Sequence, residues 1–340
     1  MTNNQSKYNY ELPFVSICTP TFNRRLFISL LIKCIKNQTY PKNKMEWIVV
    51  DDGTDCIEDL VKDIDWIQVH YIRYQEHLLL GKKRNLMHSK CKGDIIVYMD
   101  DDDYYPPERV SHAVEMLIKN PTYNIAGSSE MHLYYHDLDK LYQCGPYGQY
   151  HATAATFAFR KEILIDTQYN DGNALAEETI FLKKYTIPLL QLDTLKTILV
   201  ISHSHNSFDK KKLLETPLEC RLTASRFKPT DFIKDNDLRQ LYTKDIHVLL
   251  DNYAPGTSDH KPEILKQIKS IQESRDKRTM EYNKKMQPQI MNINFNSMEQ
   301  MKQHYEKIIA DKEKIIEDKS CLINELLKKI KHLVGNNSKL

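Results

Sequence analysis

Short apolar runs alternate with longer amphipathic segments through the first third of the chain. Apolar runs bounded by prolines, glycines or acidic residues are typical of buried strands. The strands expected on this basis are Phe14–Cys18, Glu46–Val50, Ile67–Ile72 and Asp94–Met99. The helices expected between them are Leu26–Lys36 and Lys82–Lys92, the second ended by Gly93 in a left-handed conformation. Strands that are apolar on both faces and separated by helices predict an α/β fold with a mainly parallel central sheet.

The pattern changes twice further along the chain. Residues 123–205 are mixed, and beyond about residue 210 the chain becomes lysine-rich and helical. The further strands expected are Ile125–Ser128, Met131–Tyr135, Thr156–Arg160 and Ile198–Ser202, with a helix near Glu177–Tyr185. Later helices are expected at Asp231–Tyr253, ended by Pro255 and Gly256, and at Pro262–Lys285. The predicted organisation is an α/β domain at 1–210, a helical extension at 211–286, a linker at 287–296 and a terminal helix at 297–334.

The terminal helix carries a seven-residue repeat, which predicts self-association. One seam of the repeat is formed by Ile309, Ile316, Ile323 and Ile330, and the other by Tyr305, Lys312, Lys319, Leu326 and Leu333. Ser297 and Gln300 form a capping box at the expected start. Isoleucine at one seam with leucine at the other favours a parallel two-stranded coiled coil, so we expect a homo-oligomer. Lys312 and Lys319 weaken the seam, which leaves a trimer, or packing against the protein's own body, open.

Composition narrows the class of protein. The chain has 340 residues, of which 41% are hydrophobic, so it can bury a sizeable core. A net charge of +2 gives no indication of a nucleic-acid partner. The seven cysteines include no C-x-x-C pair and predict reduced thiols rather than a disulfide framework or a zinc site. A polar N-terminus and the lack of a long apolar run predict a soluble, cytoplasmic protein without a transmembrane segment.

Acidic residues follow two of the expected strands. Four consecutive carboxylates, Asp100–Asp103, follow the fourth strand, and Asp51 and Asp52 follow the second. Ligands of open α/β sheets bind beyond the carboxyl ends of the strands, and clustered carboxylates need a compensating cation. Their oxygen ligands suit a hard divalent ion, so the sequence predicts a Mg²⁺ or Mn²⁺ site. One ion does not need four carboxylates, and we expect Asp101 to face solvent rather than to bind the metal.

Four motifs in series carry a resemblance to a known family. VSICTPTFNR (15–24), IVVDDGT (48–54), GKKRN (81–85) and GDIIVYMDDDD (93–103) occur in the order and spacing of family 2 glycosyltransferases. The chain resembles this family most clearly over these segments and more weakly to about residue 208. The resemblance implies a Rossmann-like GT-A fold for residues 1–210. It also implies a metal-dependent, inverting glycosyltransferase of the hexosyltransferase class, with a nucleotide sugar, expected to be UDP-linked, as donor.

The resemblance further implies roles for individual residues. The nucleotide-binding residues it implies are Pro20, Thr21, Asn23, Asp51, Asp52, Arg84, Asn85, Asp100 and Asp101. The family's D-x-D motif matches Asp100-x-Asp102, which is expected to bind the metal and the diphosphate, so the resemblance implies Asp102, Asp100 and His203 as metal ligands. In the family, the last aspartate of the motif binds the metal and the first lies near the ribose. Asp103 is expected to support both.

An inverting transfer also needs a base that takes the proton from the attacking hydroxyl group. In the family, an acidic pair at the start of a helix supplies this base. LAEETIFL (175–182) places Glu177 and Glu178 at the corresponding position, with Glu178 as the expected base where aspartate is usual. The alternative is that both are favourable charges at a helix N-terminus.

A histidine close to the end of the matched region is the last candidate. Many family members carry one there that binds the metal or the leaving diphosphate, and ISHSHNSF (201–208) offers two. The Asn-Ser that follows favours His203 over His205 as a metal ligand. An exposed pair of loop histidines is the alternative.

Two other functions stay open. One is a catalytically inactive GT-A-like scaffold that binds nucleotide and is oligomerised by its coiled coil. The other is a sugar nucleotidyltransferase, which normally has a glycine-rich phosphate loop, whereas CTPTFNRR (18–25) contains no glycine. The sequence does not identify the donor sugar, the linkage or the acceptor, for which a glycan, a glycolipid and a protein are all open.

Overall fold

The computed structural model describes residues 11–174, 177–215, 221–257, 260–286, 298–299, 301–307, 309–310, 313–314 and 317. The strands are β1 (Val15–Thr21), β2 (Met45–Asp51), β3 (Gln68–Arg73), β4 (Ile95–Tyr98), β5 (Ile125–Gly127), β6 (Met131–Tyr135), β7 (Lys140–Cys144), β8 (Ala158–Arg160), β9 (Leu190–Gln191), β10 (Leu199–Ser202) and β11 (Leu222–Ala224). The helices are α1 (Arg25–Lys36), α2 (Glu58–Val61), α3 (Leu80–Lys90), α4 (Arg109–Lys119), α5 (Glu178–Phe181), α6 (Lys212–Glu215), α7 (Pro229–Phe232), α8 (Asn236–Gln240), α9 (Ile246–Asp251) and α10 (Pro262–Met286).

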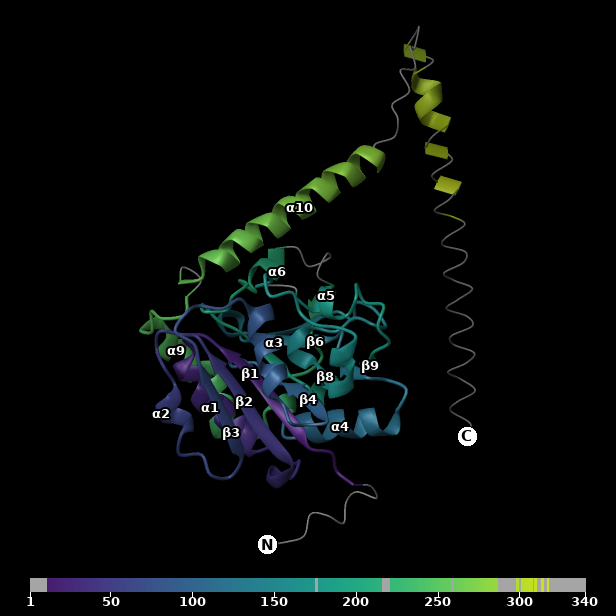
Figure 1. Cartoon of the computed structure of the whole chain (residues 1–340). Coiled ribbons are helices and arrows are strands. Elements are labelled where there is room, and N and C mark those ends of the chain that lie inside the picture. Colours follow the sequence, from purple (N-terminus) through teal and green to yellow (C-terminus); the bar gives the residue numbers. More distant parts are fainter. Residues whose placement is uncertain are drawn as a thin grey trace, which may run out of the picture. The chain divides into compact units, whose positions relative to one another are not determined.

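The larger sheet of the described residues has seven strands in the order β3-β2-β1-β4-β8-β5-β9 (Figure 1). The pairs β3/β2, β2/β1, β1/β4 and β5/β9 are parallel, and β8 runs antiparallel to both of its neighbours. The mixed α/β class and the mainly parallel sheet are therefore confirmed. In the register, Thr21 lies opposite Asp51, and Cys18 lies opposite Tyr98. The polar ends of β1, β2 and β4 consequently meet at one edge of the sheet.

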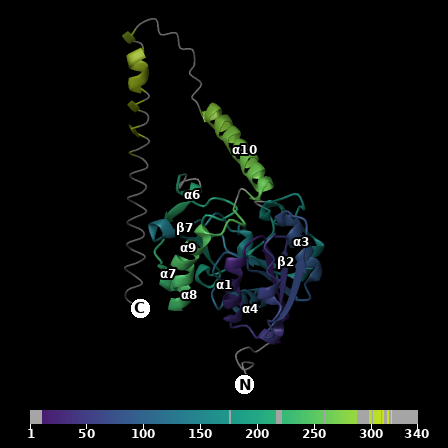
Figure 2. The ribbon, with the colours of Figure 1, turned by 90° about the vertical axis from the view of Figure 1, so that its left-hand side faces the viewer.

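Alternate residues of the central strands face two separate hydrophobic clusters. Ile17, Val49 and Val97 belong to the cluster that contains the buried residues of α1 and α4. Cys18 and Tyr98 face the opposite cluster, which includes Met87 of α3. Figure 2 shows α1, α8 and α9 on one side of β2 and α3 on the other. The sheet is thus covered on both faces, as strands that are apolar on both sides require.

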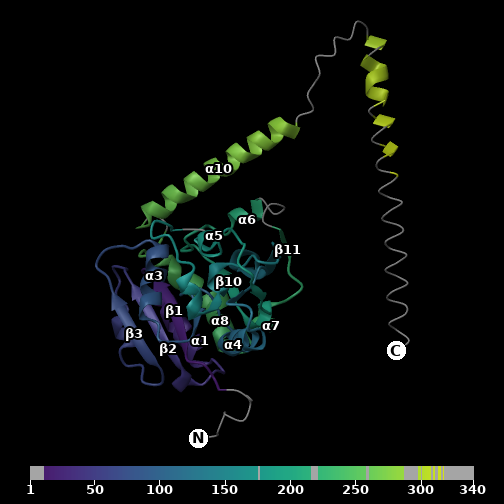
Figure 3. The same ribbon diagram turned by 45° about the vertical axis from the view of Figure 1, so that its right-hand side comes forward.

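A second sheet was not predicted as a unit. Within the described residues it has four strands in the order β10-β6-β7-β11, and Figure 3 shows β10 and β11 on the side away from β3. Strands β6 and β10 were expected, but β7 and β11 were not. The alternation in LYQC (141–144) is short, and β11 has only three residues, so neither gave a strong sequence signal.

Three predicted local features differ in the structure. The helix expected at Asp231–Tyr253 is divided into α7, α8 and α9, with a π-helical turn at Leu241–Asp245. The helix near Glu177–Tyr185 ends at Phe181, because Lys183, Lys184 and Tyr185 all have positive φ angles. Gly93 does not adopt a left-handed conformation; a Cβ there would collide with the backbone of Ser16. Glycine is therefore needed for close contact between strands rather than for a helix end.

The chain divides into two compact units, Met1–Glu273 and Ser274–Leu340. The first contains both sheets, and the buried side chains of Phe232 and Tyr242 extend its main core into the region expected as a helical extension. In the second unit, the predicted linker and most predicted seam positions lie outside the described residues. Tyr305 and Ile309 are helical, with exposed fractions of 55% and 56%. Among the described helices, none combines the length and the apolar character needed to span a bilayer.

Candidate active site

Four aspartates follow β4 and turn the chain away from the edge of the larger sheet. Asp103 is buried, where it accepts a hydrogen bond from the backbone N–H of Ile201 at 3.1 Å. The hydroxyl group of Tyr242 donates to the backbone carbonyl oxygen of Asp103 at 3.2 Å. Asp103 therefore ties strand β10 and the C-terminal helices to the aspartate turn, which is the supporting position that the sequence predicted for it.

Asp102 lies beside His203. The Asp102 Oδ2 atom is 3.2 Å from His203 Nε2, 3.4 Å from the amide nitrogen of Asn206 and 3.8 Å from Arg24 Nε. Burial alone would raise the pKa of Asp102, but the hydrogen bond with His203, together with the positive charges of Lys210 and Arg24, holds it below its ordinary value. Burial lowers the pKa of His203 to about 3, which leaves a neutral imidazole, the form that binds metal ions. His205 lies apart from this pair, with Nε2 2.6 Å from the carbonyl oxygen of Tyr253.

Asp101 does not face solvent, so that expectation is wrong. Its side chain is buried, and Oδ1 lies 3.8 Å from Arg24 Nε. Burial, together with the charge of Asp102, raises the pKa of Asp101 to about 7. Asp101 lies beneath Arg24 and is therefore shielded from solvent. The sequence contains four adjacent carboxylates and gives no indication of which of them is buried.

Arg84 connects the aspartate turn to the start of α5. Its Nη1 and Nη2 atoms lie 3.3 Å from the two carboxylate oxygens of Asp100, and its Nε donates to Glu177 Oε1 at 3.0 Å. The guanidinium is buried and stacks on Tyr98, 4.3 Å from the ring centroid. A planar donor set suits this double carboxylate contact. The structure therefore brings Asp100, Arg84 and Glu177 together, as residues of one site would be.

Glu178 is the first residue of α5 and is partly buried. Burial, together with the adjacent charge of Glu177, raises the pKa of Glu178 to about 7. A carboxylate with a pKa near the working pH can accept a proton and still be ionised often enough to act as a base. Arg84 forms its ion pair with Glu177 and not with Glu178.

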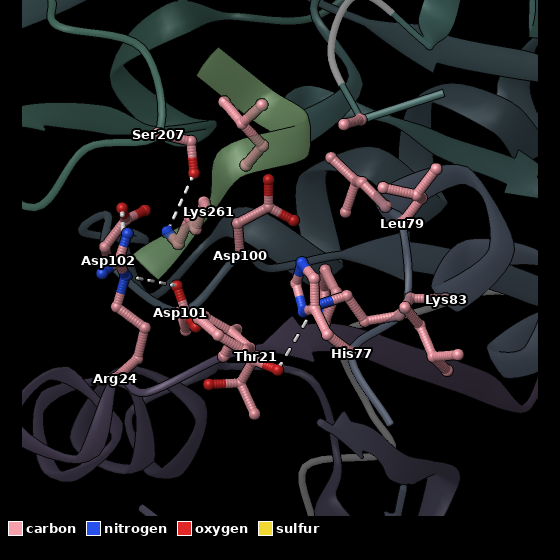
Figure 4. Close-up of a pocket in the computed structure, with 16 residues that line it drawn as sticks. Thr21, Arg24, His77, Leu79, Lys83, Asp100, Asp101, Asp102, Ser207 and Lys261 are labelled. Atoms are coloured by element: carbon pink, nitrogen blue, oxygen red, sulfur yellow. Dashed lines mark hydrogen bonds and ion pairs between the residues drawn. The ribbon is translucent and has the colours of Figure 1, made fainter. Parts of the chain in front are cut away.

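A pocket opens beside the aspartate turn (Figure 4). Its polar lining residues are Thr21, Arg24, His77, Lys83, Asp100, Asp101, Asp102, Ser207 and Lys261, and its other lining residues are Pro20, Phe22, Leu78, Leu79, Leu80, Ala174 and Ile264. Of the predicted nucleotide-binding residues, Pro20, Thr21, Asp100 and Asp101 line this pocket, and so does the predicted metal ligand Asp102. Cationic and anionic groups alternate around it, as a site for a metal-bound phosphate requires.

Four further predicted nucleotide-binding residues do not line the pocket, although the partners of Asp52 do. Asp51 accepts hydrogen bonds from Gly53, Ile57 and Tyr71, and Asp52 accepts from Leu78 and Lys83. The amide oxygen of Asn23 accepts from the backbone of Asp55 at 2.8 Å. Asn85 bonds to the backbone of Tyr169 and to Asp171, beside a different hollow of the surface. Nucleotide contact by these four residues stays a prediction.

The sequence interpretation missed several pocket residues. The sequence leaves open whether Lys83 holds phosphate or lies on a solvated basic helix start; in the structure it is buried and its Nζ lies 2.7 Å from Asp52 Oδ1. His77, Ser207, Lys261 and Ile264 were not considered at all. The last two come from the start of α10, far from the matched motifs, and nothing in the spacing of the lysine-rich segment distinguishes Lys261 from its neighbours.

The donor set can be tested against a divalent ion. Two ligands at about 2.1 Å from an octahedral ion, on adjacent corners, lie about 3 Å apart. The 3.2 Å between Asp102 Oδ2 and His203 Nε2 fits that separation. Both oxygens of Asp100 are occupied by Arg84, and no group of three or more candidate ligands is assembled within the described residues. The residues present therefore fit an ion with two protein ligands, completed by water and phosphate oxygens.

Comparison with known proteins agrees with this geometry. Residues 16–168 match glycosyl transferase family 2. This segment, which makes up less than half of the chain, is therefore similar to glycosyltransferase family 2. The matched range contains β1 to β4 and the aspartate turn, and it stops before Glu178, His203 and Lys261.

Three curated relatives match part of this chain. An uncharacterized glycosyltransferase of Haemophilus influenzae is 29% identical over 112 residues, 32% of this chain and 36% of that protein. The GalNAc(5)-diNAcBac-PP-undecaprenol β-1,3-glucosyltransferase of Campylobacter jejuni is 30% identical, over 32% of this chain and 34% of that protein. The poly(ribitol-phosphate) β-N-acetylglucosaminyltransferase TarS of Staphylococcus aureus is 27% identical, over 30% and 18%. The chain thus spans well under two thirds of the length of these relatives.

Two solved structures are similar at low sequence identity. The mannosyltransferase PcManGT of Pyrobaculum calidifontis, in complex with GDP-Man and Mn²⁺, gives a TM-score of 0.46 at 16% identity, over 69% of this chain and 70% of that chain. S. aureus TarS 1–349, in complex with UDP-GlcNAc, gives a TM-score of 0.45 at 18% identity, over 74% and 70%.

Proposed function

We propose that the protein is an inverting glycosyltransferase that moves a sugar from a nucleoside-diphosphate sugar, expected to be UDP-linked, to an acceptor hydroxyl group. Similarity to family 2 supports the transferase class, and the pocket beside Asp100–Asp102 supports a diphosphate site. The observation that carries the proposal is the Arg84 bridge. It couples the aspartate turn, where a donor would bind, to α5, where Glu178 would act.

In the proposed reaction, Glu178 accepts the proton of the acceptor hydroxyl group. The oxygen forms a bond to the anomeric carbon of the sugar, and the bond between that carbon and the phosphate oxygen breaks. Its electron pair stays on the nucleoside diphosphate, which leaves with one more negative charge. Attack from the face opposite the leaving group inverts the anomeric configuration, and general base catalysis of this kind contributes a factor of about 10²–10⁴.

The residues that would hold a divalent ion are Asp102 and His203. When bound, a Mn²⁺ or Mg²⁺ ion supplies Lewis-acid stabilisation of the charge on the departing diphosphate. Arg84 keeps Asp100 and Glu177 in fixed positions, and Asp103 holds the turn against β10. These contacts orient the site before substrates arrive, and such preorganisation is usually the largest source of electrostatic stabilisation.

The test is a donor panel. The full chain is incubated with UDP- and GDP-sugars and Mn²⁺, and nucleotide release is followed with and without a chelator. We expect release from at least one donor, loss of that release with chelator, and loss in Asp102→Ala. Wild-type protein that binds UDP or GDP without turning over any donor would favour a nucleotide-binding scaffold. Protein that binds neither nucleotide with Mn²⁺ would contradict the proposed function.

A further inference from the structure

The ammonium group of Lys261 is inserted into the pocket from outside the segment that matches family 2. Lys261 immediately precedes α10 and has an exposed fraction of 4%. Within the described residues, its hydrogen-bond partner is Ser207 Oγ at 3.1 Å. Its Nζ also lies 5.7 Å from the ring centroid of Phe22. Figure 4 shows the side chain directed toward Ser207, on the side of the pocket where Asp101 and Asp102 lie.

This position is electrostatically unusual. Burial and the nearby charge of Arg24 lower the pKa of Lys261 to about 7, although Asp101 and Asp102 favour its charged form. Lys83 is neutralised by contact with Asp52 at 2.7 Å, and Arg24 contacts both Asp101 and Asp102. A buried ammonium needs several acceptors to replace its lost water, and a single hydroxyl group supplies one of the three that its protons can use.

The segment that carries Lys261 is fixed to both walls of the pocket. Arg24 donates to the backbone oxygens of Gly256, at 3.0 Å, and of His205. On the opposite side, the side chain of Gln267 accepts from the backbone N–H of Ala174 and donates to the carbonyl oxygen of Gly172, both at 2.9 Å. The lysine is therefore held in the pocket by a braced segment rather than by chance packing of a surface side chain.

We propose that Lys261 binds the diphosphate of the donor, with its ammonium directed at the β-phosphate from which the sugar departs. This inference rests on the proposed function and names a further residue of that same site. A phosphate oxygen offers the charged acceptors that the ammonium lacks, and charge-assisted hydrogen bonds of this kind are the strong ones. The unmet donors of Lys261 and the extra charge that develops on the departing diphosphate thus complement each other.

The test compares two nucleotides that differ by the β-phosphate. Binding of UDP and UMP to the full chain is measured by calorimetry with Mn²⁺, with GDP and GMP in parallel in case guanine is preferred. We expect Lys261→Met to weaken diphosphate binding by about 10- to 100-fold and monophosphate binding by no more than about twofold. Lys266→Met is the matched control, because Lys266 is exposed on the same helix and lies outside the pocket.

Two further variants separate charge from folding. Lys261→Arg keeps the positive charge and is expected to retain diphosphate binding within about fivefold. Ser207→Ala removes the hydroxyl that holds the ammonium and is expected to weaken UDP binding by about two- to fivefold. If Lys261→Met does not fold, as circular dichroism would show, Lys261→Gln replaces it in the same comparison of UDP with UMP.

The outcomes are distinguishable. If the wild-type protein binds UDP, and Lys261→Met binds it equally well or more tightly, the role of Lys261 is overturned. The proposed function then stays intact. Equal losses for UDP and UMP also overturn it, because a general distortion of the pocket would not depend on the β-phosphate. Absence of UDP and GDP binding in the wild-type protein overturns the proposed function itself.

Discussion

Two acidic pairs lie at the carboxyl ends of nearby strands, yet the structure treats them differently. Asp51 and Asp52, after β2, are fully satisfied by the protein. Tyr71 donates to Asp51 at 2.7 Å, and Asp52 accepts from the backbone N–H of Leu78 at 2.6 Å as well as contacting Lys83. Asp101 and Asp102, after β4, line the pocket; each lies 3.8 Å from Arg24 Nε, and Asp102 also lies 3.2 Å from His203 Nε2.

The different contacts of the two pairs indicate two different roles for acidic residues at this edge of the sheet. Carboxylates that receive several short hydrogen bonds stabilise the native state, and their loss leaves buried donors without acceptors. Carboxylates that crowd one another, as Asp101 and Asp102 do, have their pKa values driven apart. Substitutions should therefore reduce stability at the first pair and ligand binding or turnover at the second site.

The largest effect is expected from Glu178→Gln, which removes the proposed base near the second pair. Transfer should fall by a factor of about 10²–10⁴, because the amide cannot accept the proton, while UDP binding should stay within about threefold. Steady-state transfer and calorimetry measure the two quantities. Glu162→Gln, on the exposed surface, is the control. Unchanged turnover in Glu178→Gln would remove Glu178 from the mechanism.

Asp102→Asn should lower metal-dependent nucleotide release by about 100-fold or more, because the amide is a far weaker ligand for a hard cation and cannot balance its charge. The melting temperature should change by only a few degrees. Release assayed over a Mn²⁺ titration, with Asp63→Asn as an exposed control, measures this. Equal release in the variant and the wild type would place the ion elsewhere.

Asp52→Asn should act on stability instead. Lys83 would keep a buried charge without its counter-charge, which destabilises the native state by about 3 kcal/mol. Denaturant unfolding measures the free energy, and UDP binding of the folded fraction should be largely retained. A variant as stable as the wild type, but unable to bind UDP, would reverse the comparison and assign Asp52 to the nucleotide.

The pH dependence of turnover tests the environment of Glu178. The base must be ionised, and its pKa is raised to about 7, so the rate should fall as the pH drops below about 7, by about tenfold per unit. A pH–rate profile at saturating donor measures the break. A rate that stays constant down to the ordinary glutamate range would show that Glu178 is solvated or does not act as the base.

The smallest effect concerns assembly. Removing residues from Ser297 onward should reduce the oligomeric mass by about the factor of two or three that separates a coiled-coil dimer or trimer from a monomer. Light scattering of the shortened and the full chain measures it. UDP binding should be unaffected in the shortened chain. An unchanged mass would contradict the coiled-coil prediction.

Much of the fold could be predicted from sequence because the relevant signals are local. The strands around Ile17, Val49 and Val97 are apolar on both faces, and helix α1 has a clear amphipathic repeat. The proximity of Asp102 and His203 was anticipated only through the family resemblance, which implies both as metal ligands; metal binding by either stays a prediction.

The remainder depends on contacts that no local pattern encodes. Arg24 covers Asp101, which is why this aspartate is buried. Arg24 is itself held in place by the backbone oxygens of His205 and Gly256, which are distant in sequence. Gly256 has a positive φ angle, and a Cβ there would collide with the carbonyl oxygen of Asn23. The second sheet likewise depends on β7 and β11, which gave no strong strand signal in the sequence.

The bracing of Arg24 by Gly256 has a consequence for protein engineering. Chimeric enzymes are commonly made by exchanging the front half of one homologue for that of another, on the assumption that donor preference travels with it. Here the part of the chain before residue 210 carries an arginine that donates to the backbone of His205, in the same part, and to the backbone of Gly256, in the part that follows. A chimera joined near residue 210 would keep Arg24 but replace the segment that contains Gly256. The junction should therefore be placed after Gln267.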